Sequence, residues 1–220
     1  MIASQTTECS CKHIVSVSLG SSERNAKSTL QLKGQTFIIE RLGTDGNLQK
    51  ARQLLEELDG RVDALGLGGT DLYVYAGGRR YTFRESAKLI ENVKNTPVLD
   101  GSGLKNSLER ILINRLAADK IIDFQGKKVL MVCGVDRFGM AEALVANGAD
   151  VTFGDLIFGL NWDHPIKSLQ TLDSFAKLLA PLLTKLPVKW FYPMGAKQSQ
   201  RKPQHLSLIH ISEPTRRTPI

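Results

Sequence analysis

The first part of the chain alternates hydrophobic and polar residues with a period of two. Residues 14–18 (IVSVS) are β-branched and alternating, which is typical of a strand. Residues 28–33 and 36–41 flank Gly34-Gln35, which favours a hairpin with a tight turn. We therefore expect the chain to begin with a strand followed by a β-hairpin.

A helical period takes over behind Asn47, a residue type that caps helices well. The apolar positions of residues 48–58 fall on one helical face, and Asp59-Gly60 closes the pattern. Residues 63–69 then predict a strand, and residues 72–83 predict two strands around a glycine pair. The segment 82–85 (TFRE) fits a capping box that opens a helix reaching about Lys94.

Strands and helices keep alternating in the second half. Residues 97–100 predict a strand, and apolar residues at helical spacing over 104–116 predict a helix. The run 129–134 (VLMVCG) is typical of a strand buried on both faces, followed by a helix over 137–147 and a strand over 149–155. One more helix spans 169–186. This alternation predicts an α/β fold, with an N-terminal α/β substrate-type domain followed by an incomplete Rossmann-like nucleotide-binding domain.

We place the domain boundary between residues 122 and 123. Residues 1–12 are expected to be a disordered leader and 123–205 a partial second domain. Residues 206–216 (LSLIHISEPTR) resemble the translation of an adapter used in DNA sequencing libraries. We therefore expect 206–220 to be a non-native tail and the chain to be an inactive fragment of a longer protein.

Composition narrows the class of protein. Lysine and arginine number 29 against 22 acidic residues, a formal charge of +7, of which residues 196–220 carry +4. The remaining charges are interspersed and aromatic residues make up 6%, which argues against nucleic-acid binding. No apolar run approaches the ~18 residues of a membrane span. We expect a cytoplasmic protein without a membrane or nucleic-acid partner, and leave a homo-oligomer open.

The three cysteines are too few for a disulfide framework. Cys9, Cys11 and His13 could supply three metal ligands, but their spacing is not that of a common zinc site. We therefore predict no metal.

The segment from Gly134 to Asp155 has the layout of a dinucleotide site. Gly134 ends a strand, Gly139 opens a helix, and Asp155 ends the next strand, where it could bind ribose hydroxyls. Asp136 stands where the glycine-rich fingerprint has its middle glycine, and Arg137 could offset its charge. The alternative is a structural strand–turn–helix with no ligand.

A second turn, at residues 100–106 (DGSGLKN), also follows a predicted strand. Asp100 could accept a hydrogen bond or a proton from a substrate hydroxyl, with Lys105 close by. The alternative is that Asp100 caps the turn and the helix.

The order LDGSGLKNSL (99–108) and then GKKVLMVCGVDRFGMAEAL (126–144) resembles the shikimate/quinate 5-dehydrogenases, together with KHIVSVSLGSS, IERLGTDG and GDLIF. The resemblance covers residues 12–198. It implies a catalytic aspartate at Asp100 and a catalytic lysine, for which Lys88, Lys94 and Lys105 are candidates. It also implies that Ser16 and Ser18 hold a substrate carboxylate.

The implied reaction is hydride transfer between a ring hydroxy acid and nicotinamide, with a lysine of lowered pKa moving the proton. Because Asp155 would repel a 2′-phosphate, we expect NAD rather than NADP. Two alternatives stay open. One is a nucleotide- or S-adenosylmethionine-binding protein without dehydrogenase activity, and the other is a noncatalytic module.

Overall fold

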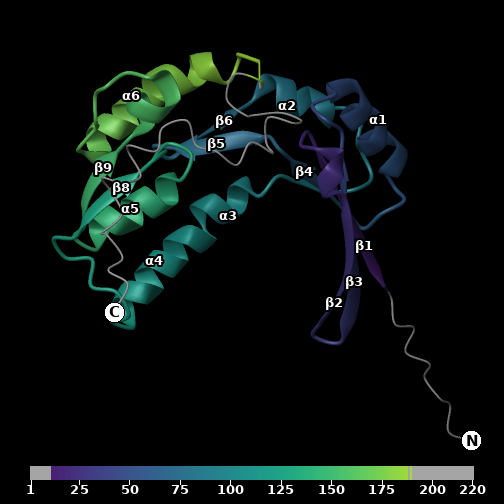
Figure 1. Cartoon of the computed structure of the whole chain (residues 1–220), viewed down its shortest axis with the longest axis horizontal. Coiled ribbons are helices and arrows are strands. Elements are labelled where there is room, and N and C mark those ends of the chain that lie inside the picture. The colour runs from purple at the N-terminus through teal and green to yellow at the C-terminus, as the bar shows by residue number, and fades with distance from the viewer. Residues whose placement is uncertain (1–10, 188, 190–220) are drawn as a thin grey trace, which may run out of the picture.

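The computed structural model describes residues 11–187 and 189, which form two lobes joined at the top of an arch (Figure 1). The first lobe, β1 to β7, is rich in strands, and the second lobe, α3 to α6, is mainly helical. The elements of the first lobe are β1 (Lys12–Ser18), η1 (Ser22–Arg24), β2 (Ala26–Leu32), β3 (Gln35–Gly43), α1 (Leu48–Leu58), β4 (Ala64–Gly68), β5 (Tyr73–Ala76), β6 (Arg79–Thr82), α2 (Arg84–Leu89) and β7 (Val98–Leu99). Those of the second lobe are α3 (Ser102–Asn106), α4 (Leu108–Ala118), β8 (Lys128–Met131), α5 (Phe138–Ala146), β9 (Asp150–Phe153), η2 (Asp155–Gly159) and α6 (Leu169–Leu183).

The chain therefore has the mixed α/β architecture expected, with a central sheet that is mostly parallel. The strand order is β2-β3-β1-β4-β7, in which β3, β1, β4 and β7 are parallel and β2 is an antiparallel edge. Helix α1 covers one face of this sheet. Its Ala51 and Leu55 are fully buried, in one cluster with Val15 and Val17 of β1 and Leu65 of β4. The alternation read from the sequence thus sets which face of β1 enters the core.

Both predicted hairpins are confirmed. Lys33 and Gly34 connect β2 to β3 with positive φ values of 51° and 78°, as a type I′ turn requires, so this turn lies one residue earlier than predicted. Gly77 and Gly78 connect β5 to β6 in the same way, with φ values of 57° and 75°. Glycine tolerates this conformation without steric cost.

Helix α1 begins as predicted, because the Asn47 side chain accepts a hydrogen bond from the Lys50 amide at 3.0 Å. Helix α2 differs from its prediction. It is capped by Phe83 without a side-chain bond, so the predicted capping box is wrong, and it ends at Leu89 rather than near Lys94.

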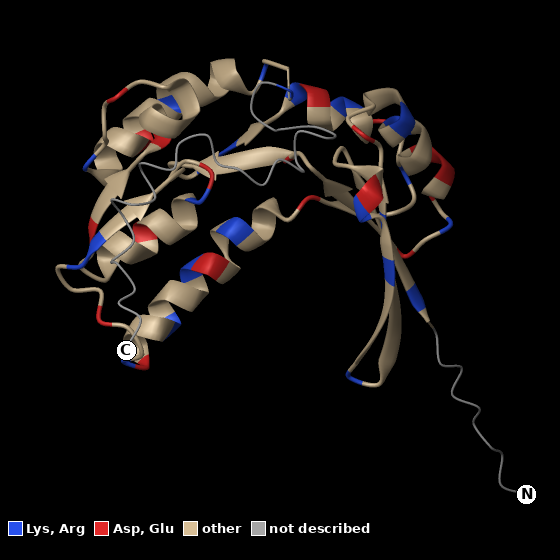
Figure 2. Ribbon diagram, viewed as in Figure 1, with Lys and Arg blue, Asp and Glu red and all other residues tan. Residues whose placement is uncertain are grey.

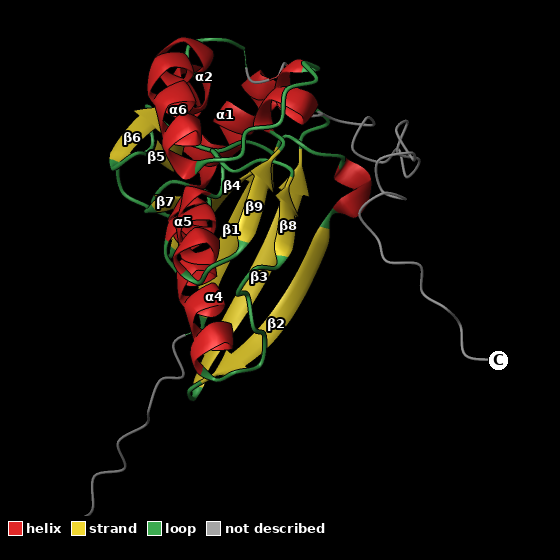
Figure 3. Cartoon of the chain, turned by 90° about the vertical axis from the view of Figure 1, so that its left-hand side faces the viewer, coloured by secondary structure: helices red, strands yellow, loops and turns green. Residues whose placement is uncertain are grey.

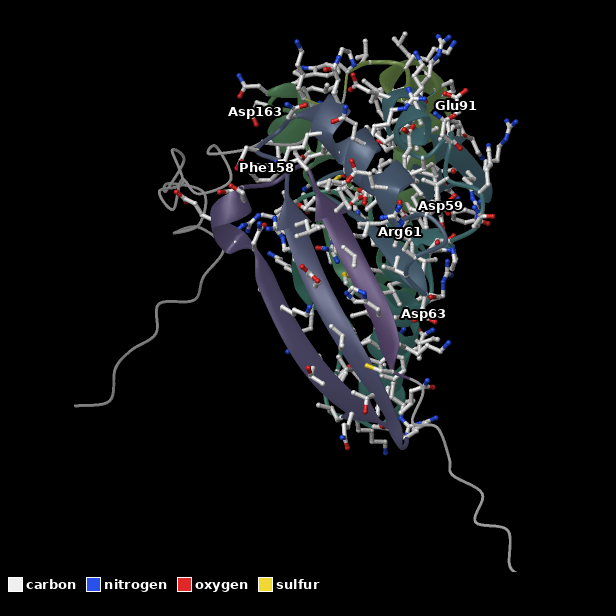
Figure 4. All side chains as sticks on the ribbon, turned by 90° about the vertical axis from the view of Figure 1, so that its right-hand side faces the viewer. Asp59, Arg61, Asp63, Glu91, Phe158 and Asp163 are labelled. Atoms are coloured by element: carbon white, nitrogen blue, oxygen red, sulfur yellow. The ribbon has the colours of Figure 1, made fainter. Side chains whose placement is uncertain are left out.

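The early end of α2 has a physical cause in Asp59. Its carboxylate accepts hydrogen bonds from the backbone amides of Lys94, Asn95 and Thr96, which holds that segment out of a helix. These bonds, that of Lys94 first, lower the pKa of Asp59 to about 2. Asp59, Arg61 and Asp63 follow α1 and lie on one side of the molecule (Figure 4).

The second lobe has its own core. Phe153 of β9 and Leu172 of α6 are fully buried there, and Ala76 of the β5–β6 hairpin belongs to the same cluster, which joins the two lobes. Strands β8 and β9 form a parallel pair connected by α5, and Figure 3 shows these strands beside the helices of this lobe. Acidic and basic residues are interspersed on both lobes (Figure 2).

Two apolar patterns were misread. Within the described part of the chain β8 pairs only with β9, and its Leu130 is 43% exposed, so β8 is not buried on both faces. The helix predicted over 104–116 is broken at Ser107 into α3 and α4. Its apolar stripe faces away from the core, as shown by the exposed side chains of Leu104, Leu108, Ile111 and Leu112.

Candidate functional site

Asp100 lies at the turn between β7 and α3, one residue before Gly101, which is the N-cap of α3. Its carboxylate accepts hydrogen bonds from the Leu72 amide at 2.5 Å, from the Ser102 amide at 3.0 Å and from the Ser102 hydroxyl. Asp100 thus holds the turn but is not the N-cap of the helix. The turn also ties α3 to the start of β5. The catalytic role of Asp100 stays a prediction.

Lys105 of α3 joins the two lobes. Its ammonium group donates to Asp71, in the loop before β5, at 2.7 Å and to Asp136, in the loop after β8, at 2.8 Å and 3.0 Å. Burial lowers the pKa of Lys105, but the hydrogen bonds and charges of Asp136 and Asp71 outweigh it and raise the pKa above its ordinary value. The lysine of lowered pKa expected for proton transfer is therefore not found at Lys105.

The other two candidates, Lys88 and Lys94, also form no hydrogen bond or ion pair with Asp100. Lys94 donates its ammonium group to the Glu91 carbonyl oxygen at 2.5 Å, and Lys88 lies in the last turn of α2. Lys105 has no hydrogen bond or ion pair with Asp100. The structure thus brings Lys105 to Asp71 and Asp136 rather than to Asp100.

The loop after β8 is held by Asp155. The carboxylate accepts hydrogen bonds from the Gly134 and Val135 amides, both at 2.9 Å, across the carboxyl ends of β8 and β9. Asp155 therefore does lie at the predicted bend. Its two oxygens, however, occupy amides that a phosphate group would need.

The two glycines of this loop serve packing. A Cβ on Gly139 would lie 2.6 Å from the backbone oxygen of Asn106, so this glycine lets α5 approach α3. A Cβ on Gly134 would lie 2.6 Å from the Phe153 ring. Arg137 forms an ion pair with Glu109 of α4 rather than with Asp136. The predicted phosphate-binding role of these glycines has no support in their surroundings, since close approach of protein atoms already explains both.

A cavity of about 410 Å³ opens at the carboxyl ends of β8 and β9. Most of its lining is apolar and comes from α6 and η2, including Phe158, Leu172 and Leu179. Asp136 and Asp155 are the charged residues in the lining, and no described lysine or arginine contributes to it. Its volume lies in the range of small-molecule sites, which are apolar with a few polar groups.

Cys133 also lines this cavity. Cys133 is exposed at the surface, yet desolvation of its thiolate by the surrounding groups, and then the negative charge of Asp155, raise the pKa of the thiol to about 12. The thiol also donates to the Asp155 carboxylate at 3.4 Å. Cys133 is thus a protonated thiol at neutral pH rather than a nucleophile.

Ser16 and Ser18 lie in β1 on the sheet face opposite α1, beside a cation that sequence reasoning missed. The Arg41 guanidinium group donates to the Ser18 hydroxyl oxygen at 3.0 Å and to the Ser21 carbonyl oxygen at 3.0 Å. In the sheet register Arg41 is the direct neighbour of Ser16. No sequence motif signals this pair, because it depends on the pairing of β1 with β3.

The described residues also bear on two earlier expectations, those about a membrane span and a metal site. None of the helices there combines the length and apolar character that a membrane crossing needs. No three metal-ligating side chains of that part are grouped together, and Cys9 of the metal alternative lies outside it. Residues 1–10 of the expected leader, residues 188 and 190–205, and the expected tail 206–220 also lie outside the described residues.

Comparison with known protein families gives two matches, each to a domain of unknown function. DUF8753 matches residues 13–100 and DUF8754 matches residues 103–211. The two matches meet at the turn between β7 and α3, and the second extends six residues into the segment from 206 onward. The boundary expected at residues 122–123 stays a prediction. No curated protein matches the chain.

Proposed function

We propose that this chain belongs to an NAD-linked oxidoreductase of the quinate/shikimate 5-dehydrogenase type, which acts on a ring hydroxy acid. The observation that carries the proposal is the apolar cavity at the carboxyl ends of β8 and β9, with Asp155 in its lining. Parallel α/β sheets bind ligands at this edge. An adenine ring suits an apolar cavity of this size, and an acidic side chain beside it suits ribose hydroxyls.

The fit to NAD differs between the halves of the cofactor. For the adenosine half, each Asp155 oxygen accepts one backbone amide, which leaves lone pairs that ribose hydroxyls could use. The diphosphate half fits poorly, because Asp155 fills two loop amides and the Asp136 carboxylate stands beside the loop. Asp155 and the cavity would therefore hold the adenosine end of NAD.

On the substrate side, Ser16 and Ser18 are the residues that would hold the acid. The nicotinamide ring would supply the hydride acceptor. Lys105 would act as a permanent ammonium group that orients polar atoms, because its raised pKa makes it a poor base. Asp100, which already accepts three hydrogen bonds, would serve the site by fixing the turn that carries Lys105.

A pair of variants on α6 tests cofactor binding. Leu179 lines the cavity, whereas its neighbour Leu178 is 73% exposed and lies outside it. We expect NAD to raise the melting temperature of the wild-type chain and of Leu178→Trp but not of Leu179→Trp. NAD-dependent oxidation of quinate is followed in parallel by NADH absorbance. An equal response to NAD in both variants would remove the cavity from the proposal.

A second candidate is an S-adenosylmethionine-binding protein, and the charge of the cavity favours it. Asp136 is paired with Lys105, but Asp155 lines the cavity with no lysine or arginine among the described lining residues, and its charge repels a diphosphate but accommodates a sulfonium and an ammonium group. The two candidates give opposite results in the same assay. Stabilisation by S-adenosylmethionine without stabilisation by NAD would select the second.

A further inference from the structure

Arg41 of β3 is a half-buried cation without an acidic partner. Its guanidinium group donates hydrogen bonds to two neutral oxygens, the Ser21 carbonyl and the Ser18 hydroxyl, both at 3.0 Å. No carboxylate among the described residues forms an ion pair with it, although the chain carries ten ion pairs elsewhere in that part. Buried charges in proteins are normally paired. A cation left in this state is therefore suited to an anion from outside.

The surroundings of Arg41 add to this need for an anion. Burial, and then the positive charge of Arg24, lower the pKa of Arg41 below its ordinary value. The positive charge of Arg24 therefore acts on Arg41 and disfavours its charged form. An oxyanion between or beside them would relieve the repulsion and replace lost hydration.

Serine hydroxyls and glycines complete the surface next to Arg41. Ser16 has Arg41 as its neighbour on one side and Gly66 on the other. A Cβ on Gly66 would lie 3.2 Å from the Ser16 hydroxyl, and one on Gly68 would lie 3.0 Å from the Ser18 hydroxyl. Because β4 has glycines here, no side chain from that strand covers the half-buried Ser16. Ser18 is only 4% exposed, and its hydroxyl oxygen accepts the Gly20 amide at 3.1 Å as well as Arg41, so Ser18 holds the guanidinium group from behind.

The position in the sheet is also that of a ligand site. After β1 the chain forms β3 on one side of it and β4 on the other, so β1 lies where the strand order switches direction. In parallel α/β sheets ligands bind outside the carboxyl ends of the strands at such a point. Ser16 and Ser18 belong to the carboxyl-terminal half of β1.

We propose that Arg41 and Ser16, with Ser18 positioning the guanidinium group and with Arg24 nearby, form a binding site for an oxyanion group, either a carboxylate or a phosphate. The proposal deepens the proposed function, since a hydroxy-acid substrate would supply the carboxylate. It adds a specificity-determining arginine to the serine pair implied by the family resemblance. The second arginine favours a doubly charged oxyanion over a singly charged one.

The competing explanation is that Arg41 only braces the loop that contains Ser21. A brace would need no anion, and its loss would change stability without changing ligand binding. Titration separates these explanations, with inorganic phosphate and quinate as the probes at low ionic strength. Arg61 supplies a matched control, because it is an exposed arginine of the same lobe (Figure 4).

Calorimetric titration should show both probes binding to the wild-type chain. We expect Arg41→Gln to weaken both by about tenfold, the loss of one charge-assisted contact, while Arg61→Gln binds like the wild type. Arg41→Lys should fall between them. Arg24→Gln should weaken phosphate more than quinate. Tighter phosphate than quinate would identify the doubly charged anion as the ligand, and the reverse would identify the acid substrate.

A second measurement does not depend on the variants folding. In the wild-type chain, phenylglyoxal modification of Arg41, followed by peptide mass spectrometry, should slow when phosphate or quinate is added, whereas modification of Arg61 should not. Unchanged binding by Arg41→Gln, or no protection of Arg41, would overturn the site. Neither readout involves NAD, so the site can fail while the cofactor proposal stands, and the reverse.

Discussion

The carboxyl ends of β1 and β8 carry charged groups of opposite sign. Each is a parallel strand that runs into a glycine-containing turn. At the end of β8 the protein supplies its own anion, since Asp155 accepts the Gly134 and Val135 amides. Beside β1 it supplies a cation, Arg41, which forms no ion pair with a carboxylate of the described residues. The comparison teaches that a strand–glycine–turn pattern locates an edge of the sheet, while the partners of its charged groups decide what can bind there.

The largest expected effect concerns the packing of the second lobe. Gly139→Val should lower the free energy of unfolding by about 3 kcal/mol, because its Cβ would meet the Asn106 backbone, which cannot move easily. Urea denaturation measures this. Gly159→Val is the control, since nothing lies within 4 Å of a Cβ there, and it should stay within about 0.5 kcal/mol. A Gly139→Val variant as stable as the wild type would show that packing does not require this glycine, and ligand binding would then have to explain it.

The next effect concerns the ionic link between the lobes. Lys105→Met should cost about 2 kcal/mol, because it leaves the buried Asp71 and the half-buried Asp136 without their cation. Since the pKa of Lys105 is raised, its contribution is complete below the ordinary lysine pKa of 10.5 and is lost as pH rises through the raised value.

Denaturation of the wild-type chain and Lys105→Met as a function of pH checks that link. The stability difference should be constant from pH 7 to 9 and shrink above about pH 10.5. Lys105→Arg, which keeps the charge, should retain most of the stability. A difference that grew with pH would contradict the assigned direction of the pKa shift.

A somewhat smaller effect concerns the hydrogen bonds of Asp155 at the end of β8. Asp155→Ala should cost about 1.5 kcal/mol, because two partly buried amides lose a charged acceptor. Asp163 provides the control, as an exposed aspartate eight residues further along, and Asp163→Ala should be neutral. If both variants were equally stable, the contrast between the two sheet edges would be lost.

The smallest effect is on reactivity rather than stability. With a pKa raised to about 12, Cys133 should react with iodoacetamide at pH 8 at least about a hundredfold more slowly than in the unfolded chain. The rate is measured by mass spectrometry in a Cys9→Ser, Cys11→Ser background. Asp155→Ala should increase it by removing a negative charge. Fast alkylation of the folded wild type would show that the pKa of the Cys133 thiol is not raised.

Local signals predicted the fold well, whereas the site depended on pairings that no local signal carries. The hairpins at Gly34 and Gly77 and the cap at Asn47 follow from the conformational preferences of a few adjacent residues. The apolar stripe that begins at Leu104 has the period of a buried helix face, yet burial depends on what else the chain places against it. Asp155 was expected to end a strand but opens η2, and its bonds to the Gly134 and Val135 amides follow from the geometry of the β8 turn.

The place of Arg41 beside Ser16 could not be predicted from local sequence signals either. In the sequence this arginine is one basic residue at the end of a strand, and only the register between β1 and β3 makes it the neighbour of Ser16.

One edge of β8 bears on how the protein would behave in concentrated solution. Within residues 11–187 this edge has no partner strand, and Leu130 and Val132 beside it are 43% and 57% exposed, so it is a template for intermolecular strand addition. Strand addition of this kind would make the light scattering of the protein rise steeply with concentration. A charged replacement such as Val132→Lys would be the first change to make before crystallisation or storage.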